Sequence, residues 1–379
     1  MKNKLFLLIT TLLITASSFA QAPPIDGVVS PEVHPDGKVT FRIRAAKANE
    51  VTLGGDWVAT GTKLPMTKDA EGIWSTTIGP LEATLHLYSF TVDGVTMADP
   101  VNPRIKLRQR TSGSIVEIPA HPSAPWELHD VPHGSVEVNW QRSTVISGET
   151  RQVFVYLPPG YDKNPKQRYP VLYLLHGSGD TAESWTQAGS ANLILDNLIA
   201  EKKAKPMIVV MPFGHAVPFG SPPDIAKKNV PLMEEYMIKE ILPWAESKYR
   251  VAAGRQNRAI AGLSMGGGQT FAISFGHLDL FSNIGVFSSA PGQDWAERNK
   301  ALLADAKGTN AKLNVFWYGI GDKDQLAYPR AKDATEMLNK NQIRHTFRVI
   351  EGGFHSWPVW RRCLSEFAPL LFSGGKTGA

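Results

Sequence analysis

The strongest constraint on the fold is a regular alternation of short apolar runs with longer, helix-like stretches after residue 134. Stretches such as residues 233–249 and 331–341 separate several of these runs. Strands that are apolar throughout must be covered on both faces, and helical connections join parallel neighbours. The pattern therefore predicts an α/β domain over residues 134–379, with a mostly parallel sheet. The expected strands cover residues 153–157, 171–175, 207–211, 259–261, 284–287, 315–320 and 347–350.

The preceding region, residues 24–119, has a different pattern, in which apolar residues alternate with polar ones. Val39, Phe41 and Ile43 would share one face of a strand, and turn signals rich in glycine and aspartate follow at regular spacing. No amphipathic helix of useful length is evident there. Short strands at this spacing predict a small all-β, immunoglobulin-like sandwich. Further strands are expected at residues 51–53, 74–78 and 86–92.

Residues 120–133 contain three prolines, at positions 122, 125 and 132. Proline lacks a backbone N–H donor, so a segment this rich in it is poorly suited to regular structure. We interpret the segment as a linker, or as a strap laid over a neighbouring surface.

The beginning of the chain has the pattern of a secretory signal. Lys2 and Lys4 precede an apolar run over residues 5–14, and small residues then lead to Ala20. The apolar run is too short for a comfortable membrane span. We therefore expect residues 1–20 to be removed by cleavage after Ala20, leaving a periplasmic or secreted protein that is not bound to the membrane. The single cysteine, Cys363, excludes an internal disulfide and a cysteine-based zinc site.

Composition excludes several classes of function. The chain has 379 residues with 42% hydrophobic content, and its 40 basic and 35 acidic residues form no long charge run. These values argue against a disordered chain and against a basic stripe that binds nucleic acid. The sequence has no H-E-x-x-H motif and no phosphate-binding loop, so we expect no metal and no cofactor.

The most informative motif is G-L-S-M-G at residues 262–266, which matches G-x-S-x-G. It follows the expected strand at residues 259–261 and precedes a helix-compatible run over residues 267–275. A strand-to-helix turn this tight leaves no room for side chains at the two glycines, so the serine hydroxyl is pushed out at the carboxyl edge of the sheet. The pattern predicts Ser264 as a catalytic nucleophile.

A serine hydroxyl needs a base to remove its proton and a carboxylate to orient that base. His355 lies in a loop between the last expected strand and the final helix, and it follows Ser264 in chain order. The acid is expected where the strand at residues 315–320 ends, and both Asp322 and Asp324 qualify there. The sequence thus predicts a Ser-His-Asp triad whose acid is one of two neighbouring aspartates.

The tetrahedral intermediate of acyl transfer needs two N–H donors aimed at its oxyanion. The amide after the nucleophile, that of Met265, is expected to supply one. The glycine-rich loop after the strand at residues 171–175 is expected to supply the other, from the amide of Ser178. Loops at the same edge of the sheet should contact the substrate. The residues expected to do so are Gly177, Asp180, Trp185, Phe213, His215 and Trp357.

Five short segments carry a family resemblance: residues 156–161, 174–177, 261–267, 321–324 and 353–355. With them, the chain from residue 131 to residue 372 resembles the putative-esterase branch of the α/β-hydrolases. It is similar to carbohydrate esterase family 1, the feruloyl and acetylxylan esterases, with enterochelin-esterase and mycolyltransferase relatives. The acid of that family follows a G-x-x-D pattern, which matches Gly321 and Asp324, so the resemblance favours Asp324 over Asp322. The family's second oxyanion donor follows an H-G pair, which again indicates Ser178.

The first region resembles the early-set, glycogen-binding-like modules that precede such esterases. Residues 88–94 and 99–103 carry this likeness. Trp57 and Trp74 could stack on sugars in such a module, or they could belong to its core.

The resemblance implies a secreted serine carboxylic-ester hydrolase that acts on plant cell-wall polysaccharide esters, as a feruloyl or an acetylxylan esterase. The expected partner is an ester linked to an arabinoxylan-like polysaccharide, with no nucleic acid and no membrane. Two alternatives stay open. One is a siderophore (enterochelin-like) esterase or a peptidase on the same fold, and the other is a non-catalytic carbohydrate-binding protein.

Overall fold

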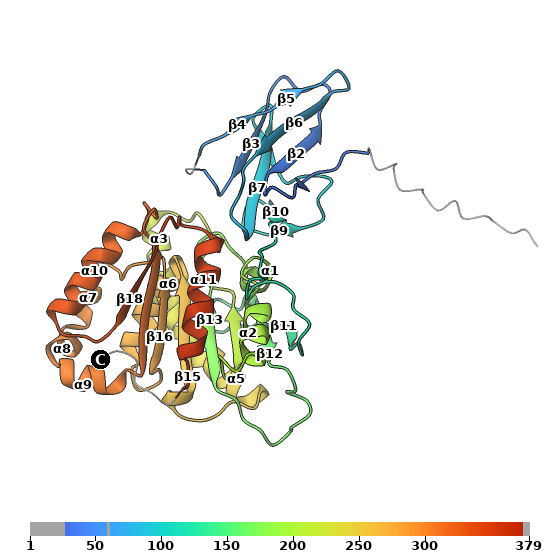
Figure 1. The fold of residues 1–379 in the computed structure, drawn as a ribbon. Helices are drawn as coiled ribbons and strands as arrows, with labels where there is room; N and C mark the ends of the chain where they lie inside the picture. The colour runs from blue at the N-terminus through green and yellow to red at the C-terminus, as the bar shows by residue number, and fades with distance from the viewer. Residues whose placement is uncertain (1–26, 59–60, 374–379) are drawn as a thin grey trace, which may run out of the picture.

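The computed structural model describes residues 27–58 and 61–373. The expected signal at residues 1–20 lies outside the described residues. Across the part described, no helix is long and apolar enough to span a membrane. Figure 1 shows a small β-sheet region beside a larger region in which helices pack around a sheet.

The N-terminal region contains two antiparallel sheets. One has the strand order β1-β2-β6-β5 and the other has the order β4-β3-β7-β10-β9, with β8 paired to β7. Val39 and Phe41 of the first sheet share a buried core with Leu53 and Phe90 of the second. The two sheets form a sandwich, because each supplies one apolar face to this core. The strands are β1 Glu32–Val33, β2 Val39–Arg44, β3 Val51–Gly55, β4 Leu64–Pro65, β5 Thr67–Lys68, β6 Ile73–Ile78, β7 Leu85–Val92, β8 Val95–Met97, β9 Ile105–Lys106 and β10 Gly113–Glu117.

Residues 118–134 contain no helix or strand and lie across the larger region. Trp126 is buried in the core of that region. The Asn197 side chain, on helix α2, donates to the backbone oxygens of Pro125 and Glu127, each at 2.8 Å. These contacts hold the segment as a strap over α2. We propose that the domain boundaries lie on either side of the strap, at residues 119 and 134.

The larger region is built on a sheet of eight strands in the order β11-β12-β14-β13-β15-β16-β17-β18. β11 and β12 pair antiparallel, and the other six strands are parallel to one another. All seven expected strands are present, and the predicted fold class is confirmed. The sequence pattern does not predict β11, because its apolar residues Val136, Val138 and Trp140 are exposed on an edge strand. The strands are β11 Ser135–Arg142, β12 Thr150–Leu157, β13 Val171–Leu175, β14 Ile208–Pro212, β15 Arg258–Leu263, β16 Asn283–Phe287, β17 Val315–Gly321 and β18 Thr346–Ile350.

Helices cover both faces of this sheet (Figure 1). On one face, Leu172 of β13 packs in the same core as Ile194 of α2 and Phe367 of α11. The next residue, Tyr173, lies in a second core with Met233 of α4. Successive side chains of a strand point to opposite faces, so each strand serves both cores. The helices are α1 Ser184–Gln187, α2 Ala191–Ala200, α3 Pro223–Ala226, α4 Asn229–Tyr236, α5 Leu242–Lys248, α6 Met265–Gly276, α7 Trp295–Arg298, α8 Lys300–Ala304, α9 Ala306–Lys312, α10 Tyr328–Lys340 and α11 Trp357–Phe367.

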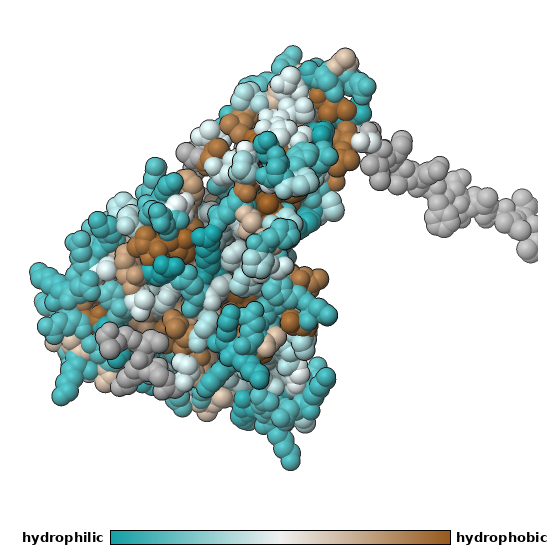
Figure 2. Space-filling view, viewed as in Figure 1, coloured by the Kyte–Doolittle hydropathy of each residue, from teal (hydrophilic) through white to brown (hydrophobic). Residues whose placement is uncertain are grey.

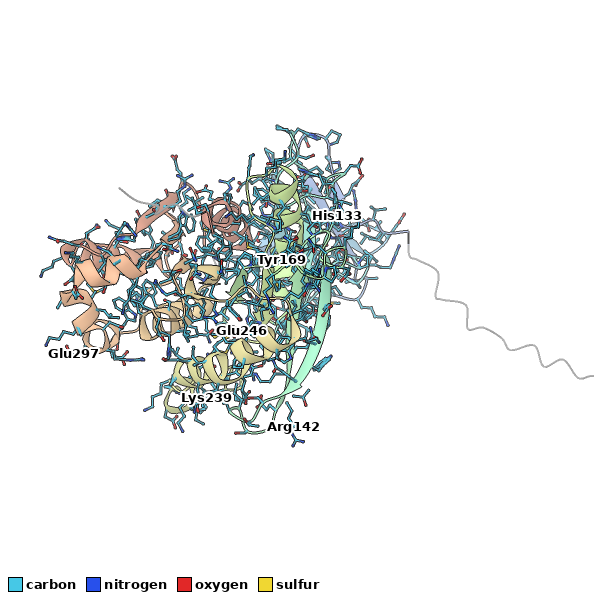
Figure 3. The ribbon with its side chains drawn as sticks, turned by 90° about the horizontal axis from the view of Figure 1, so that it is seen from below. His133, Arg142, Tyr169, Lys239, Glu246 and Glu297 are labelled. Atoms are coloured by element: carbon cyan, nitrogen blue, oxygen red, sulfur yellow. The ribbon has the colours of Figure 1, made fainter. Side chains whose placement is uncertain are left out.

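The two expected helices at residues 233–249 and 331–341 are present. The expected helix at residues 233–249 is a run of three elements, in which the π-helical turn η1 (Met237–Ile241) joins α4 to α5. Lys239 and Glu246 lie along this run when the molecule is seen from below (Figure 3). The expected helix at residues 331–341 corresponds to α10. Two short 3₁₀ turns complete the element list, η2 Arg255–Asn257 and η3 Ala368–Leu370.

The sandwich is packed against one end of the larger region. Figure 1 shows β9 and β10 on the side that meets α1 and α11. Leu85 of β7 and Ile115 of β10 are buried in the same core as the strands and helices of the larger region. Glu117 of β10 accepts a hydrogen bond from the buried Arg361 of α11 at 2.8 Å. The face seen in Figure 2 is mainly hydrophilic, with small apolar patches on both regions.

Candidate active site

Ser264 occupies a sharp turn between β15 and α6. Its backbone angles are φ 51° and ψ −116°, a conformation that L-residues rarely adopt. A Cβ on Gly262 would meet the backbone oxygen of Gly266 at 2.3 Å, and a Cβ on Gly266 would meet the backbone oxygen of His176 at 2.6 Å. The two glycines are therefore required by close backbone approach, and the turn projects the serine at the carboxyl edge of the sheet.

Three side chains from separate loops form a hydrogen-bonded chain at this edge. Ser264 Oγ lies 2.9 Å from His355 Nε2, and His355 Nδ1 donates to Asp324 Oδ2 at 2.7 Å. With the proton on Nδ1 facing the carboxylate, Nε2 presents its lone pair to the serine hydroxyl. The arrangement has the geometry of a nucleophile, a base and an orienting acid.

The two candidate acids occupy different environments. Asp324 is fully buried, and its second carboxylate oxygen accepts hydrogen bonds from the amides of Ala327 at 2.9 Å and Leu326 at 3.2 Å. Asp322 is exposed at the surface of the same turn. The structure therefore brings Asp324, and not Asp322, to the imidazole of His355.

The two residues whose amides are the predicted oxyanion donors lie at the same cleft as the serine. Met265 is the first residue of α6, a helix of 12 residues, and Ser178 lies in the loop after β13. Both residues line the cleft together with Ser264 and His355. Within the described residues, neither amide donates a hydrogen bond to another protein atom. The N-terminus of a helix also favours negative charge, so this position suits an oxyanion.

We propose that the loop that carries Ser178, residues 177–180, supplies one oxyanion donor, and this loop is called the oxyanion loop below. Two buried histidines hold it from within the α/β domain. His176 Nδ1 donates to the backbone oxygen of Gly177 at 2.9 Å, and the amide of Gly179 donates to His215 Nε2 at 3.0 Å. Burial lowers the pKa of each imidazole to about 4, so both rings are neutral at pH 7.

The cleft beside Ser264 has a volume of about 570 Å³. Its walls come from the start of α4, from α6, from the loop after β16 and from the start of α10. The lining contains both apolar and charged side chains. The apolar contributors are Val230, Pro231, Met265, Ala272, Ala290, Trp295, Leu326 and Ala327. The charged contributors, apart from the histidine, are Lys227, Asp294, Arg298 and Arg330.

The structure brings none of the six expected substrate-binding residues into the lining of this cleft. Trp185 is fully buried and donates from Nε1 to the backbone oxygen of Leu175 at 3.0 Å. Trp357 packs edge-on against it, with ring centroids 5.3 Å apart. The carboxylate of Asp180 is buried and paired with the ammonium of Lys106. These three side chains have structural partners and are not available to a substrate in this conformation.

Of the remaining three expected residues, Gly177 belongs to the oxyanion loop, and Phe213 and His215 pack beside it. Phe213 stacks on His176 with ring centroids 5.7 Å apart, and His215 is occupied by the amide of Gly179. A Cβ on Gly177 would meet a methyl group of Leu263 at 2.6 Å, so this glycine serves packing. The prediction placed all six residues at the correct edge of the sheet, but on the side of Ser264 that is closed by the protein core.

Apart from Ser178, Ser264, Met265 and His355, the residues that line the cleft were not predicted as part of the site. Trp295 follows β16 and Leu326 follows β17. Both could have been found by applying the sheet-edge argument to every strand rather than to three of them. Val230, on α4, has no comparable signal, because helix packing alone brings it there. As for metals, the described residues contain no cluster of three or more His, Cys, Asp or Glu side chains that could hold an ion.

Comparison with known proteins places this site in a family. A family model described as "Putative esterase" matches residues 143–371. An endo-1,4-beta-xylanase/feruloyl esterase of Xylanibacter ruminicola is 36% identical over 356 residues, which are 90% of this chain. The chain spans only 46% of the length of that relative.

Two solved structures illustrate the similarity of the fold. A ferulic acid esterase superposes with a TM-score of 0.53 at 29% identity, covering 62% of this chain and 97% of that one. The enterobactin esterase of Shigella flexneri gives a TM-score of 0.65 at 16% identity, covering 88% of this chain and 92% of that one. At that identity the second likeness concerns the fold alone.

Proposed function

The chain belongs to the putative esterase family, and from this premise we propose that it is a serine carboxylic-ester hydrolase acting on plant cell-wall polysaccharide esters. The observation that carries the proposal is the hydrogen-bonded chain from Ser264 through His355 to Asp324, open to a cleft. The 36% identical relative from Xylanibacter ruminicola, an endo-1,4-beta-xylanase/feruloyl esterase, supports xylan-linked esters as the substrate class. We propose feruloyl esters as the first candidate and acetyl esters as the second.

In the proposed reaction, an acyl group passes from the substrate to Ser264 and then to water. His355 Nε2 takes the hydroxyl proton as Ser264 Oγ attacks the ester carbonyl, and the amides of Met265 and Ser178 stabilise the oxyanion. The protonated imidazole then gives its proton to the departing sugar oxygen, which leaves an acyl-enzyme. A water molecule, deprotonated by His355, attacks that ester, and the acid is released as Ser264 regains its proton. Asp324 stabilises the imidazolium in both steps.

The size and lining of the cleft support an aromatic acyl group. An acetyl group needs little space, whereas a cleft of about 570 Å³ with Trp295, Val230 and Leu326 in its walls can hold a hydroxycinnamoyl ring. Apolar walls with a few polar groups are typical of sites that bind planar aromatic ligands.

A substrate panel tests this proposal. Hydrolysis of methyl ferulate, an aryl acetate and acetylated xylan should be measured under the same conditions, as kcat/KM. We expect methyl ferulate to be the best of the three. Turnover of the acetyl esters alone would remove the feruloyl proposal and leave an acetylxylan esterase.

A second candidate, a siderophore esterase, is favoured by the charges of the cleft. Lys227, Arg298 and Arg330 contribute three cationic side chains, against the single acidic side chain of Asp294. Catecholate siderophores are anionic, so such a lining would attract them. A catecholate serine ester added to the panel separates the two functions. A clear preference for this ester over methyl ferulate would favour the siderophore esterase.

We also propose that the protein acts outside the cytoplasm, after removal of residues 1–20. The pattern of Lys2, Lys4 and the apolar run before Ala20 supports this. N-terminal sequencing of protein isolated from the native cell envelope or medium should begin at Gln21. Material that begins at Met1 would contradict the proposal.

A further inference from the structure

A short segment of the N-terminal sandwich lies directly against the oxyanion loop. The segment, residues 106–110, starts in β9 and is called the clamp segment. The amide of Gln109 donates to the backbone oxygen of Gly179 at 2.8 Å, and its side chain donates to the backbone oxygen of Asp180 at 3.2 Å. The sandwich therefore holds, through backbone contacts, the loop that carries the Ser178 amide.

Lys106 makes the strongest of these contacts. Its side chain is fully buried, and its ammonium donates to the carboxylate of Asp180, which is also buried. The ammonium lies 3.4 Å from Ser184 Oγ and 5.5 Å from the ring centroid of Trp357. A buried ammonium and a buried carboxylate each depend on the other for compensation, so removing one leaves an unpaired charge inside the protein.

These contacts complete a set of ties on both sides of Ser178. The α/β domain holds Gly177 and Gly179 through its two buried histidines, and the clamp segment holds Gly179 and Asp180 from the outside. Ser178 lies between the tied residues, with an amide that has no partner among the described residues. An oxyanion donor acts only if it is fixed in position before the reaction begins.

We propose that Lys106 is a positioning residue for the oxyanion hole, so that the N-terminal sandwich completes the active site of the α/β domain. Lys106 does not line the cleft, so we do not expect it to contact the substrate. It acts through Asp180, by holding the oxyanion loop so that the Ser178 amide points at the reacting carbonyl. This inference rests on the proposed esterase function.

The same interface offers a matched control. Arg362 of α11 pairs with Glu82 of the sandwich, and both side chains are partly exposed. This pair joins the same two regions but has no contact with residues 177–180. A variant that weakens the interface without moving the oxyanion loop is therefore available in Arg362→Gln.

The test compares Lys106→Met and Arg362→Gln with the parent protein as full chains. Active sites are first titrated with a fluorophosphonate, so that kcat refers to folded, competent molecules. For Lys106→Met we expect kcat to fall by about 10²-fold, as when an oxyanion donor is lost, with KM within about twofold. The second-order rate of fluorophosphonate inactivation should fall in parallel, because that reaction uses the same donors. Arg362→Gln should keep the parent kcat.

Because Lys106→Met leaves Asp180 unpaired inside the protein, the double variant Lys106→Met, Asp180→Asn, which removes both charges, guards against a low yield of folded protein. We expect it to fold and still to show the reduced kcat. A kcat per active site within about threefold of the parent in either variant would overturn the positioning role while leaving the proposed esterase intact. A parent protein that neither reacts with the fluorophosphonate nor hydrolyses any ester would overturn both.

Discussion

The two sides of Ser264 differ in how far their side chains are buried, although both sides are built at the same edge of the sheet. On one side lies the open cleft, with Leu326 and charged side chains in its lining. On the other side, Trp185 and Trp357 are buried and the Lys106–Asp180 ion pair is excluded from water. The difference separates two tasks. We propose that the open side selects the substrate and that the closed side holds the backbone amides in position for the reaction.

The largest effect on activity should come from removing the hydroxyl of Ser264, which lies between the open side and the closed side. Ser264→Ala deletes the proposed nucleophile, and we expect it to lower kcat by about 10⁶-fold, as removal of the serine does in other triad enzymes. Its thermal unfolding should stay close to that of the parent, because only one half-buried hydroxyl is lost. Steady-state hydrolysis of the best panel substrate measures the first quantity, and calorimetry measures the second. Near-normal hydrolysis would refute the assignment.

The two neighbouring aspartates should differ sharply. Asp324→Asn removes the charge that orients His355, and we expect a loss of about 10⁴-fold in kcat. Asp322→Asn, the matched control two residues away, should change kcat by less than about twofold, because this residue is exposed and away from the imidazole. Equal losses in the two variants would contradict the hydrogen-bonded chain described above.

The Asp324 and Asp322 variants test a choice that the spacing of residues in the sequence left open. Ser264, His355 and the pair of candidate acids were identified because parallel strands end at one edge of a sheet, so chain order and loop position bring the three residue types together. The choice of Asp324 came from family resemblance, since spacing alone does not tell a buried turn residue from an exposed one. The predicted order of strands and helices was correct, and the same sheet-edge argument explains why the side chains of Ser264, His355 and Asp324 lie together in the structure.

Sequence reasoning failed where the result depended on the direction in which a side chain points. Trp185 and Trp357 follow the correct strands, but α1 and α11 turn their rings toward the core shared with α2. The direction in which a side chain leaves a short helix depends on packing between distant segments, which no local pattern encodes. β11 escaped detection because an exposed edge strand lacks the continuous apolar run that identifies a buried one. The Lys106–Asp180 pair joins residues 74 positions apart and gives no local signal.

One substitution on each side of Ser264 tests whether the closed side serves stability and the open side serves substrate binding. Trp185→Ala should lower the free energy of unfolding by about 3–5 kcal/mol, because it leaves a cavity in the core. Leu326→Ala, on the exposed rim, should leave stability within about 0.5 kcal/mol of the parent. It should lower kcat/KM for methyl ferulate by about 3–10-fold, since apolar contact is lost there. Denaturant titration and the substrate panel measure both variants. An equal loss in the free energy of unfolding for Trp185→Ala and Leu326→Ala would contradict the distinction between a closed and an open side of Ser264.

The buried histidines predict a dependence of stability on pH. His176 and His215 have pKa values lowered by burial from 6.5 to about 4, so between these values the unfolded chain binds protons that the folded chain does not. Above pH 6.5 the two histidines do not lower the free energy of unfolding. As the pH falls from 6.5 toward 4, they lower it progressively. At pH 5 this reduction should reach about 1–2 kcal/mol for each histidine.

The histidine prediction has its own comparison variant. His215→Gln keeps an acceptor for the amide of Gly179 but cannot take up a proton. Urea titrations at pH 7.5 and pH 5 should show a smaller loss of stability on acidification for this variant than for the parent. The same loss in both proteins would mean that the pKa of His215 is not lowered in the folded state.

The most direct measurement for the whole account is to treat the parent protein with a fluorophosphonate and to locate the adduct by peptide mass spectrometry. The account predicts a single adduct, on Ser264, formed at a rate that exceeds the background reaction of other serines. A folded protein that takes up no label, or that is labelled at a different serine, would contradict it and would favour a carbohydrate-binding protein without catalysis.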